Sequence, residues 1–215
     1  MPNGQPLGTR RIERDSVEFA RVANLSDGVF AIALTLLVLG LDVPDVGSVP
    51  LTEQLLERVP NLIGFGLGFG LVANVWWAHH AFVGRLAAFD PGLVRLNLLA
   101  LALVALAPFP TGLVGAAPTD RAAVVFFIGL FLALIGVTLA MVVHAHRFRA
   151  WRYPLSADLY RWVRGSWIAA FAGMSTALLV ALWLPVGGLI VATLSGALVE
   201  PLIARRAPRG YAEWA

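Results

Sequence analysis

Long apolar stretches dominate the hydrophobic pattern of this 215-residue chain, and short segments rich in charge separate them. A transmembrane helix needs about 20 consecutive, mostly apolar residues. Five stretches reach that length: 61–83, 93–116, 122–145, 165–184 and 186–204. Only the Leu184-Pro185 corner separates the last two, which predicts a tight helical hairpin.

An N-terminal sixth span is less obvious from the pattern. Its uninterrupted apolar run covers only residues 28–41, and this 14-residue length also suits a helix in a soluble core. The run reaches membrane length only if Leu25, Ser26 and Asp27 belong to the same helix. We count it as a span, so the sequence predicts an all-α integral membrane protein with six transmembrane helices.

The pattern divides the chain into three predicted parts. These are a cytoplasmic tail with a short amphipathic helix (1–20), a six-helix transmembrane domain (21–204) and a C-terminal cytoplasmic tail (205–215). The first ten residues are predicted to be disordered, and Ile12, Phe19 and Val22 predict the amphipathic helix. Glu13 and Asp15 interrupt any apolar core, so this start is not predicted to be a signal peptide.

The arginines set the predicted orientation, because cytoplasmic loops of membrane proteins carry an excess of positive charge. All 16 positive charges of the chain are arginines. Six alternating spans place 14 of them on one side and only Arg58 and Arg121 on the other. The side with 14 arginines is therefore predicted to be cytoplasmic, which makes the chain a multi-pass cell-membrane protein with both termini in the cytoplasm.

The composition fits a lipid bilayer as the surroundings, since 59% of the residues are apolar and 13% are charged. A soluble protein of this length would have to expose much of that apolar surface to water. The absence of cysteine excludes disulfides and thiolate metal sites. The net charge of +3 does not indicate nucleic-acid binding, because the arginines lie between apolar runs and not on one basic face.

Ser26 and Asp27 are the most informative polar residues because they lie within the first span. An ionisable residue in a transmembrane segment is costly, and it is a functional candidate whose partner must be found. The alternative is that both residues only cap a helix that begins there, where an acid interacts favourably with the helix dipole. We expect the helix to begin upstream, which favours a polar network.

The predicted topology brings further polar residues to the depth of Asp27, near the cytoplasmic end of the spans. The second span runs inward and the third begins inside, and buried polar groups need hydrogen-bond partners. Arg21 lies off the helical face of Asp27 and is expected to pair across helices. The predicted members of this structural or gating network are Arg21, Ser26, Asp27, Trp76, Trp77, His79, His80 and Asn97.

The histidines do not predict a metal site. Neighbouring helical residues such as His79 and His80 point about 100° apart, and the chain supplies no thiolate. His144 and His146 adjoin several arginines, which predicts a solvated or headgroup-facing helix end. No nucleophile and base come together in the pattern, so we expect no enzyme, no catalytic residue and no cofactor.

Three segments resemble the transmembrane-protein-175 family of potassium channels. The first helix of that family carries the signature R-x-x-x-F-S-D; Arg21, Ser26 and Asp27 match it, and Leu25 stands in place of the phenylalanine. Two further segments are similar to its second and third helices: NVWWAHHAF (74–82) and RLNLLALALVALAPFPTGL (95–113). The resemblance implies a homotetramer of six-helix subunits that conducts potassium ions, with the first helices lining a central pore.

The first span also carries an apolar stripe. Ile32, Leu36 and Leu39 follow one another at spacings of four and three residues and share one helical face, with Thr35 at its margin. A symmetric ring of subunits encloses a pore with one such stripe from each subunit, and aliphatic rings gate by dewetting. The periodicity alone favours ordinary helix packing, but the resemblance reverses this and favours a pore constriction at these four residues.

Potassium preference would then come from pore width and the Thr35 hydroxyl, because the carbonyl-filter sequence TVGYG is absent. The alternative function is a small secondary transporter of an ion or small solute. Transporters have broken helices and charged residues near the bilayer midplane. The segment Ala107-Pro108-Phe109-Pro110 is one such interruption.

We predict that cysteines placed near Arg58 and Arg121 react with a membrane-impermeant thiol reagent added to intact cells. A cysteine near Arg152 is expected not to react, because the positive-inside rule places that loop in the cytoplasm. The chain has no cysteine of its own, so each labelling signal reports a single site. Labelling near Arg152 from outside the cell would contradict the predicted topology.

Overall fold

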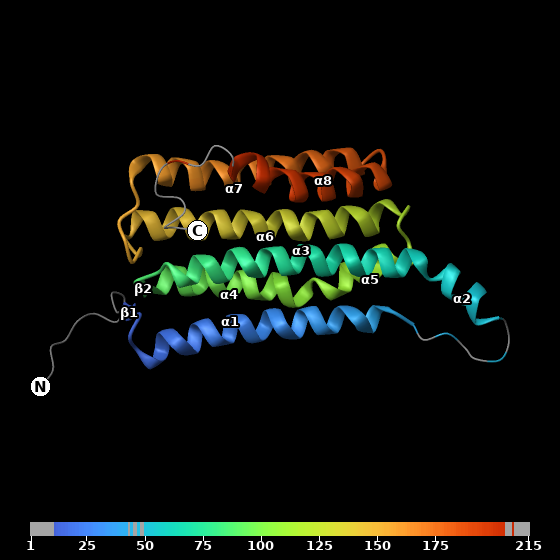
Figure 1. Ribbon diagram of the computed structural model, residues 1–215, viewed down its shortest axis with the longest axis horizontal. Coiled ribbons are helices and arrows are strands. Elements are labelled where there is room, and N and C mark those ends of the chain that lie inside the picture. The colour runs from blue at the N-terminus through green and yellow to red at the C-terminus, as the bar shows by residue number, and fades with distance from the viewer. Residues whose placement is uncertain (1–10, 43, 45–46, 48–49, 205–207, 209–215) are drawn as a thin grey trace, which may run out of the picture.

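The computed structural model describes residues 11–42, 44, 47, 50–204 and 208 (Figure 1). Its elements, in chain order, are β1 (Ile12–Glu13), α1 (Val17–Leu36), the 3₁₀ helix η1 (Leu37–Gly40), α2 (Leu51–Glu57), α3 (Val59–Gly84), β2 (Ala88–Phe89), α4 (Pro91–Leu106), α5 (Pro108–Ala116), α6 (Arg121–Arg147), α7 (Ala157–Ala181) and α8 (Pro185–Ala204). The protein is a bundle of helices that run nearly parallel to its long axis (Figure 1).

The helices are arranged in layers (Figure 1). α1 forms one outer layer, and α7 and α8 form the opposite one. α6 and the group of α3, α4 and α5 lie between them, with α6 packed on α4 and α7. The buried apolar core follows these contacts and draws on every layer.

The described residues contain five helical segments that are long and apolar enough to cross a membrane. These are Val17–Gly40, Val59–Gly84, Pro91–Ala116, Arg121–Arg147 and Ala157–Ala181. The apolar part of α8, Pro185–Ala197, is shorter. The prediction of an all-helical membrane protein is therefore confirmed, with five long spans and one shorter helix. The tight turn between α7 and α8 is also present, whereas the short helix α2 was not predicted.

The first helix begins at Val17, well before Ser26 and Asp27. Ser16 is its N-cap, and the Ser16 side chain accepts a hydrogen bond from the Phe19 backbone N–H at 3.2 Å. The interpretation of Ser26 and Asp27 as helix caps is therefore wrong. A separate amphipathic helix is also absent from the described part of the N-terminus, because Ile12 belongs to β1 and α1 runs without a break from Val17. The tail predicted to be disordered (1–10) and most of the C-terminal tail (205–215) lie outside the described residues.

The third predicted span is broken at Ala107, between α4 and α5. Pro108 has no backbone N–H and so cannot continue the hydrogen-bond ladder. The Val104 carbonyl, which a residue with an N–H at position 108 would otherwise bond, accepts instead from the Ala107 backbone N–H at 3.0 Å. Bonding of this kind makes a helix break tolerable inside a membrane.

Glycines in α3 allow a close approach to α5. A Cβ atom on Gly64 would lie 2.8 Å from the Gly115 Cα, and one on Gly68 would lie 2.4 Å from the Thr111 side chain. Gly66 and Gly70 have no such neighbour within 4 Å. One face of α3 is thus fitted to α5, as small residues at helix contacts in membranes commonly are.

Backbone pairing ties together the connections at one end of the bundle, where α1 begins and α3 ends. We call this the arginine-rich end. β1 pairs antiparallel with β2, so that Ile12 faces Phe89. The Arg14 guanidinium donates to the Gly84 carbonyl at 2.8 Å and to the Leu86 carbonyl at 2.9 Å. The α6–α7 connection joins them through a hydrogen bond from the Ala87 N–H to the Ala150 carbonyl at 2.8 Å.

Asp90 and His144 connect α4 and α6 at the same end. His144 Nε2 lies 2.9 Å from both carboxylate oxygens of Asp90, and Asp90 also caps α4 by accepting from the Leu93 N–H at 2.9 Å. Burial raises the pKa of the Asp90 carboxyl, but the hydrogen bonds from His144 and Leu93 outweigh it, and the pKa is lowered overall. The prediction of a solvated helix end is wrong for His144, and His146 stacks on the ring of Tyr160.

Candidate functional site

The back of α1 carries a chain of hydrogen bonds that joins it to α3 and α4. Asn97, fully buried on α4, donates from Nδ2 to the Ser26 hydroxyl on α1 at 3.0 Å. His79 of α3 is also buried, and its Nε2 lies 2.7 Å from Asn97 Oδ1, which requires the Nε2–H tautomer of the imidazole. Ser26 in turn donates to the Val22 carbonyl at 2.9 Å. Each donor in this buried chain therefore has an acceptor.

Asp27 makes a second connection between α1 and α3, closer to solvent. Trp76 Nε1 donates to Asp27 Oδ1 at 3.0 Å, and His80 Nδ1 lies 3.6 Å from the same oxygen. The Asp27 and His80 side chains are 47% and 58% exposed, so this pair is much wetter than the Asn97 layer. The Trp76 ring packs on the His80 ring with centroids 5.5 Å apart.

We call Ser26, Asp27, Trp76, His79, His80 and Asn97 the polar layer. The structure thus brings together six of the eight residues that were predicted to form a network. Within the described part of the chain, no hydrogen bond or ion pair joins Arg21 or Trp77 to this layer. Arg21 is exposed, and Trp77 is 63% exposed on another side of α3.

A cavity of about 240 Å³ adjoins the polar layer. Its walls include Arg14, Asp27 and His80, together with the buried Ser26 and His79. The described residues contain no group of three or more His, Cys, Asp or Glu side chains that could hold a metal ion. The cavity therefore leaves space beside the layer without forming a metal centre.

The front of α1 is left uncovered by the described residues of the subunit. Ile32 is 60% exposed, Leu36 41% and Leu39 74%, whereas Phe30 and Ala33 on the back are 1% exposed. These three exposed side chains are the stripe that the sequence pattern predicted, with Leu39 lying in η1.

Two further positions extend the exposed stripe toward the arginine-rich end. Leu25 is 51% exposed, and Gly28 has no atom within 4 Å of its Cβ position. Leu25 lies seven residues before Ile32, which is close to two helical turns and so places both on one face. The stripe thus runs along almost the whole helix.

Thr35 lies within this exposed face. Its hydroxyl donates to the Ile32 carbonyl at 2.8 Å and approaches the Ala31 carbonyl at 3.2 Å. Because the proton is used within the helix, the oxygen lone pairs remain available as acceptors on the exposed side. The four predicted constriction residues are therefore exposed on one side of α1 and η1.

The sequence interpretation missed two residues that tie segments together at the arginine-rich end. Arg14 holds the Gly84 and Leu86 carbonyls, and Asp90 fixes His144 across two helices. The only sequence signal for Asp90 is its place just before Pro91, which is typical of a helix N-cap. For Arg14 the sequence shows only a charge, with no sign of its carbonyl partners.

Together these features define a multi-pass, all-helical membrane protein in which a polar layer holds the first helix. Residues 21–108 match the family described as endosomal/lysosomal potassium channel TMEM175. A potassium channel of Chamaesiphon minutus is 34% identical over 193 residues, which cover 79% of this chain and 89% of that protein. A potassium channel of Streptomyces collinus is 36% identical over 125 residues, covering 57% of this chain and 61% of that protein.

The fold matches as well. The crystal structure of a lysosomal potassium-selective channel TMEM175 homolog from Chamaesiphon minutus superposes with a TM-score of 0.63 at 29% identity, covering 86% of this chain and 99% of that chain. The chain belongs to the TMEM175 family of potassium channels. The resemblance seen in the sequence is thereby confirmed, and so is the expectation that this protein is not an enzyme.

We predict that Asn97→Leu destabilises the folded protein by about 1–3 kcal/mol, because it leaves the buried His79 ring without its partner and removes the donor to Ser26. The matched control is Thr138→Val on α6. Thr138 is 2% exposed, but its hydroxyl donates only to the Leu134 carbonyl of its own helix, at 2.9 Å.

Thermal melting of the purified protein in detergent measures both variants. Asn97→Leu should melt well below the parent and below Thr138→Val. Equal melting temperatures for the two variants would show that the polar layer does not stabilise the packing of α1 on α3 and α4.

Proposed function

We propose that this chain assembles as a homotetramer that forms a potassium-selective channel, with one α1 from each subunit around a central pore. The observation that carries the proposal is the two-sided character of α1. Its back is bonded to α3 and α4 through Ser26 and Asp27, whereas its front is an uncovered stripe. A stripe from each of several subunits encloses a path that one subunit cannot form.

In this proposal the narrowest part of the path is aliphatic. Ile32, Leu36 and Leu39 offer a permeating ion no replacement for its water, so the barrier at these rings depends on how much water the pore retains. The Thr35 oxygen supplies a polar contact between the apolar rings. Potassium holds its water less tightly than smaller cations do, so a constriction that forces partial dehydration favours it.

The relatives support potassium as the permeant ion. Both bacterial relatives are described as potassium channels, and the Chamaesiphon homolog is described as potassium-selective. A secondary transporter would be expected to carry charged residues near a helix break at the membrane midplane. The described residues near the break at Ala107 include no charged side chain, which favours the channel over the transporter alternative.

We further propose that both termini face the cytoplasm. The start of α1 lies at the arginine-rich end, together with Arg85, Arg147 and Arg152, whereas Arg58 and Arg121 lie at the opposite ends of their helices. This arrangement follows the positive-inside rule. The cavity beside the polar layer then opens toward the cytoplasm.

A flux assay with the purified protein in vesicles tests the proposed activity. Vesicles loaded with potassium should take up a tracer cation when the outside solution holds little potassium, and less so when sodium replaces potassium inside. Single-channel recording in a planar bilayer distinguishes a channel from a transporter by the size of the current. The absence of any cation flux from correctly folded protein would contradict the proposal.

We predict that Ile32→Asn or Leu36→Asn raises single-channel conductance and lowers the preference for potassium over sodium, because an amide hydrates the constriction. Thr35→Val should lower the preference without closing the pore. Val38→Asn is the matched control, since Val38 is 50% exposed but lies in η1 beside the stripe of Ile32, Leu36 and Leu39 and not in it. Unchanged conductance and preference in both asparagine variants at Ile32 and Leu36 would mean that α1 does not line the pore.

A further inference from the structure

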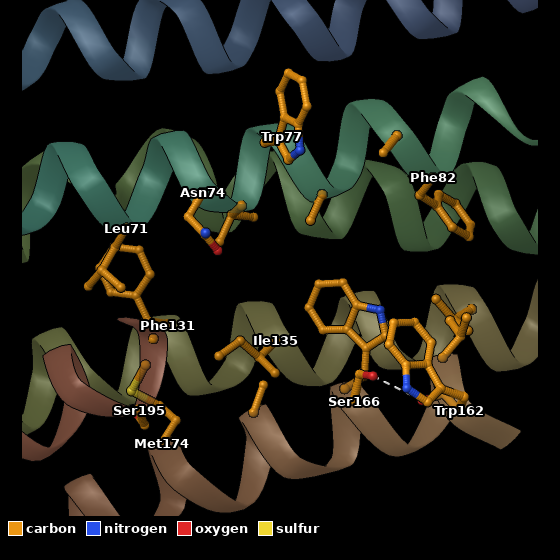
Figure 2. A pocket seen from close by; sticks show the side chains of 18 of the residues that line it. Leu71, Asn74, Trp77, Phe82, Phe131, Ile135, Trp162, Ser166, Met174 and Ser195 are labelled. Carbon is orange, nitrogen blue, oxygen red and sulfur yellow. Dashed lines mark hydrogen bonds between the residues drawn. The ribbon is translucent and has the colours of Figure 1, made fainter. Parts of the chain in front are cut away.

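A crevice of about 290 Å³ lies on the other side of the subunit, between α3 and the pair of α6 and α7 (Figure 2). We call it the α3–α7 crevice. Leu71 and Phe131 lie at one end of it, and Phe82 and Trp162 lie toward the other (Figure 2). Small side chains such as Ala78 on α3 and Ala170 on α7 leave the space between its walls unfilled. It is separate from the polar layer and from the stripe on α1.

The crevice occupies only one half of the membrane-spanning length. Its wall on α3 runs from Leu71 to Arg85, and the 14 helical steps between these two residues correspond to about 21 Å. One leaflet of a bilayer, with its headgroup region, is about 20–22 Å thick. The crevice therefore reaches from the arginine-rich surface to roughly the bilayer midplane, which is the depth that a single phospholipid occupies.

The lining changes from mostly apolar at the deep end to aromatic and basic at the mouth. A phospholipid changes in the same order, from its acyl chains to its headgroup. The deep end is mostly apolar, with Leu71, Phe131 and Met174, and the polar side chain of Asn74 lies beside Leu71 (Figure 2). The hydroxyl of Ser195 adds little polarity there, because it donates to the Ala192 carbonyl of its own helix at 2.9 Å. Ser166 lies toward the other end, beside Trp162, and donates to the Trp162 carbonyl at 2.9 Å (Figure 2).

The mouth of the crevice is aromatic and basic. Trp162 and Trp167 line it near the surface, where tryptophan is enriched in membrane proteins. Arg85 lies at its edge. Arg164 is exposed near this mouth on α7, and the neighbouring Arg161 is ion-paired with Asp158 of the same helix. Basic pockets between transmembrane helices on the cytoplasmic side bind anionic lipid headgroups.

We propose that the α3–α7 crevice is a binding site for an anionic phospholipid, with an acyl chain between α3 and α7 and the headgroup beside Arg85. Asn74, near the deep end, argues for a different occupant, because its amide could form hydrogen bonds with another subunit but not with an acyl chain. Its side chain is exposed and has no hydrogen-bond partner among the described residues. The confinement of the crevice to one leaflet and its basic mouth favour the lipid, and a second copy of this chain is an outcome that the experiment must detect.

Thermal melting of the purified full-length protein in detergent tests the site, with added phosphatidylglycerol compared with phosphatidylcholine of the same acyl chains. A ligand near saturation raises the melting temperature of the state that it binds. Phosphatidylglycerol should raise that of the parent by several degrees, and clearly more than phosphatidylcholine does. Glycerol phosphate, which has the headgroup charge without acyl chains, should have no effect.

Paired variants locate the effect. Ala170→Leu fills the crevice and should abolish most of the rise, whereas Ala172→Leu, an exposed position on α7 outside the crevice, should keep it. Arg85→Gln should remove the advantage of phosphatidylglycerol over phosphatidylcholine, and Arg95→Gln, which removes an exposed charge on α4, should not. Ala78→Leu on the opposite wall replaces Ala170→Leu if the latter does not give a monodisperse protein.

Three results would overturn the proposal. The first is a full rise in Ala170→Leu and Ala78→Leu, and the second is an equal rise with both lipids in the parent. The third is efficient disulfide-linked dimer formation by Ala170→Cys in the otherwise cysteine-free chain, which would show that a second copy occupies the crevice.

Discussion

The amide of Asn97 must have hydrogen-bond partners because it is completely buried in a part of the protein that lies within the membrane. Neither lipid nor water can supply them at that depth. Its Nδ2 therefore donates a hydrogen bond to Ser26 on α1, and its Oδ1 accepts one from the His79 Nε2–H on α3. Because amide and imidazole bonds are directional, these contacts fix the rotation of α1 about its own axis as well as its distance from the other helices.

The rotation of α1 decides which of its side chains are left without a protein partner. With Ser26 turned toward Asn97, the residues on the opposite face are Ile32, Thr35, Leu36 and Leu39. The proposed pore surface is thus a consequence of the polar layer behind it. Arg14 and the β1–β2 pairing hold the start of the same helix from the arginine-rich end, so α1 is held both at its beginning and along its back.

The sequence predicted the spans well because their signal is local: about 20 apolar residues in a row require no knowledge of the neighbours. It also brought Ser26 and Asn97 to one depth, because alternating topology alone fixes the direction of each helix. Arg21 and Trp77 were grouped with them by depth, but depth does not give the rotation of a helix. In the structure both residues lie on other faces.

The features that were not predicted depend on contacts between distant segments. Arg14 and Asp90 find their partners about 70 and 54 residues away along the chain, and such pairs leave no local pattern. The strand at Ile12 forms only because its backbone pairs with that of β2. The break at Ala107 could be seen as a proline signal, but the hydrogen bond from the Ala107 N–H to the Val104 carbonyl, which occupies the acceptor left free by Pro108, became visible only in the folded chain.

The central claim is that the front of α1 faces the ions. The most direct test is a set of single-cysteine variants at positions 32, 36, 38 and 39, recorded in a planar bilayer while a water-soluble, positively charged thiol reagent is added. The account predicts that modification at Ile32→Cys, Leu36→Cys and Leu39→Cys blocks the current, and that Val38→Cys stays conducting. Block at Val38→Cys with unaffected currents at Ile32→Cys and Leu36→Cys would contradict it, because a different side of the helix would then line the pore.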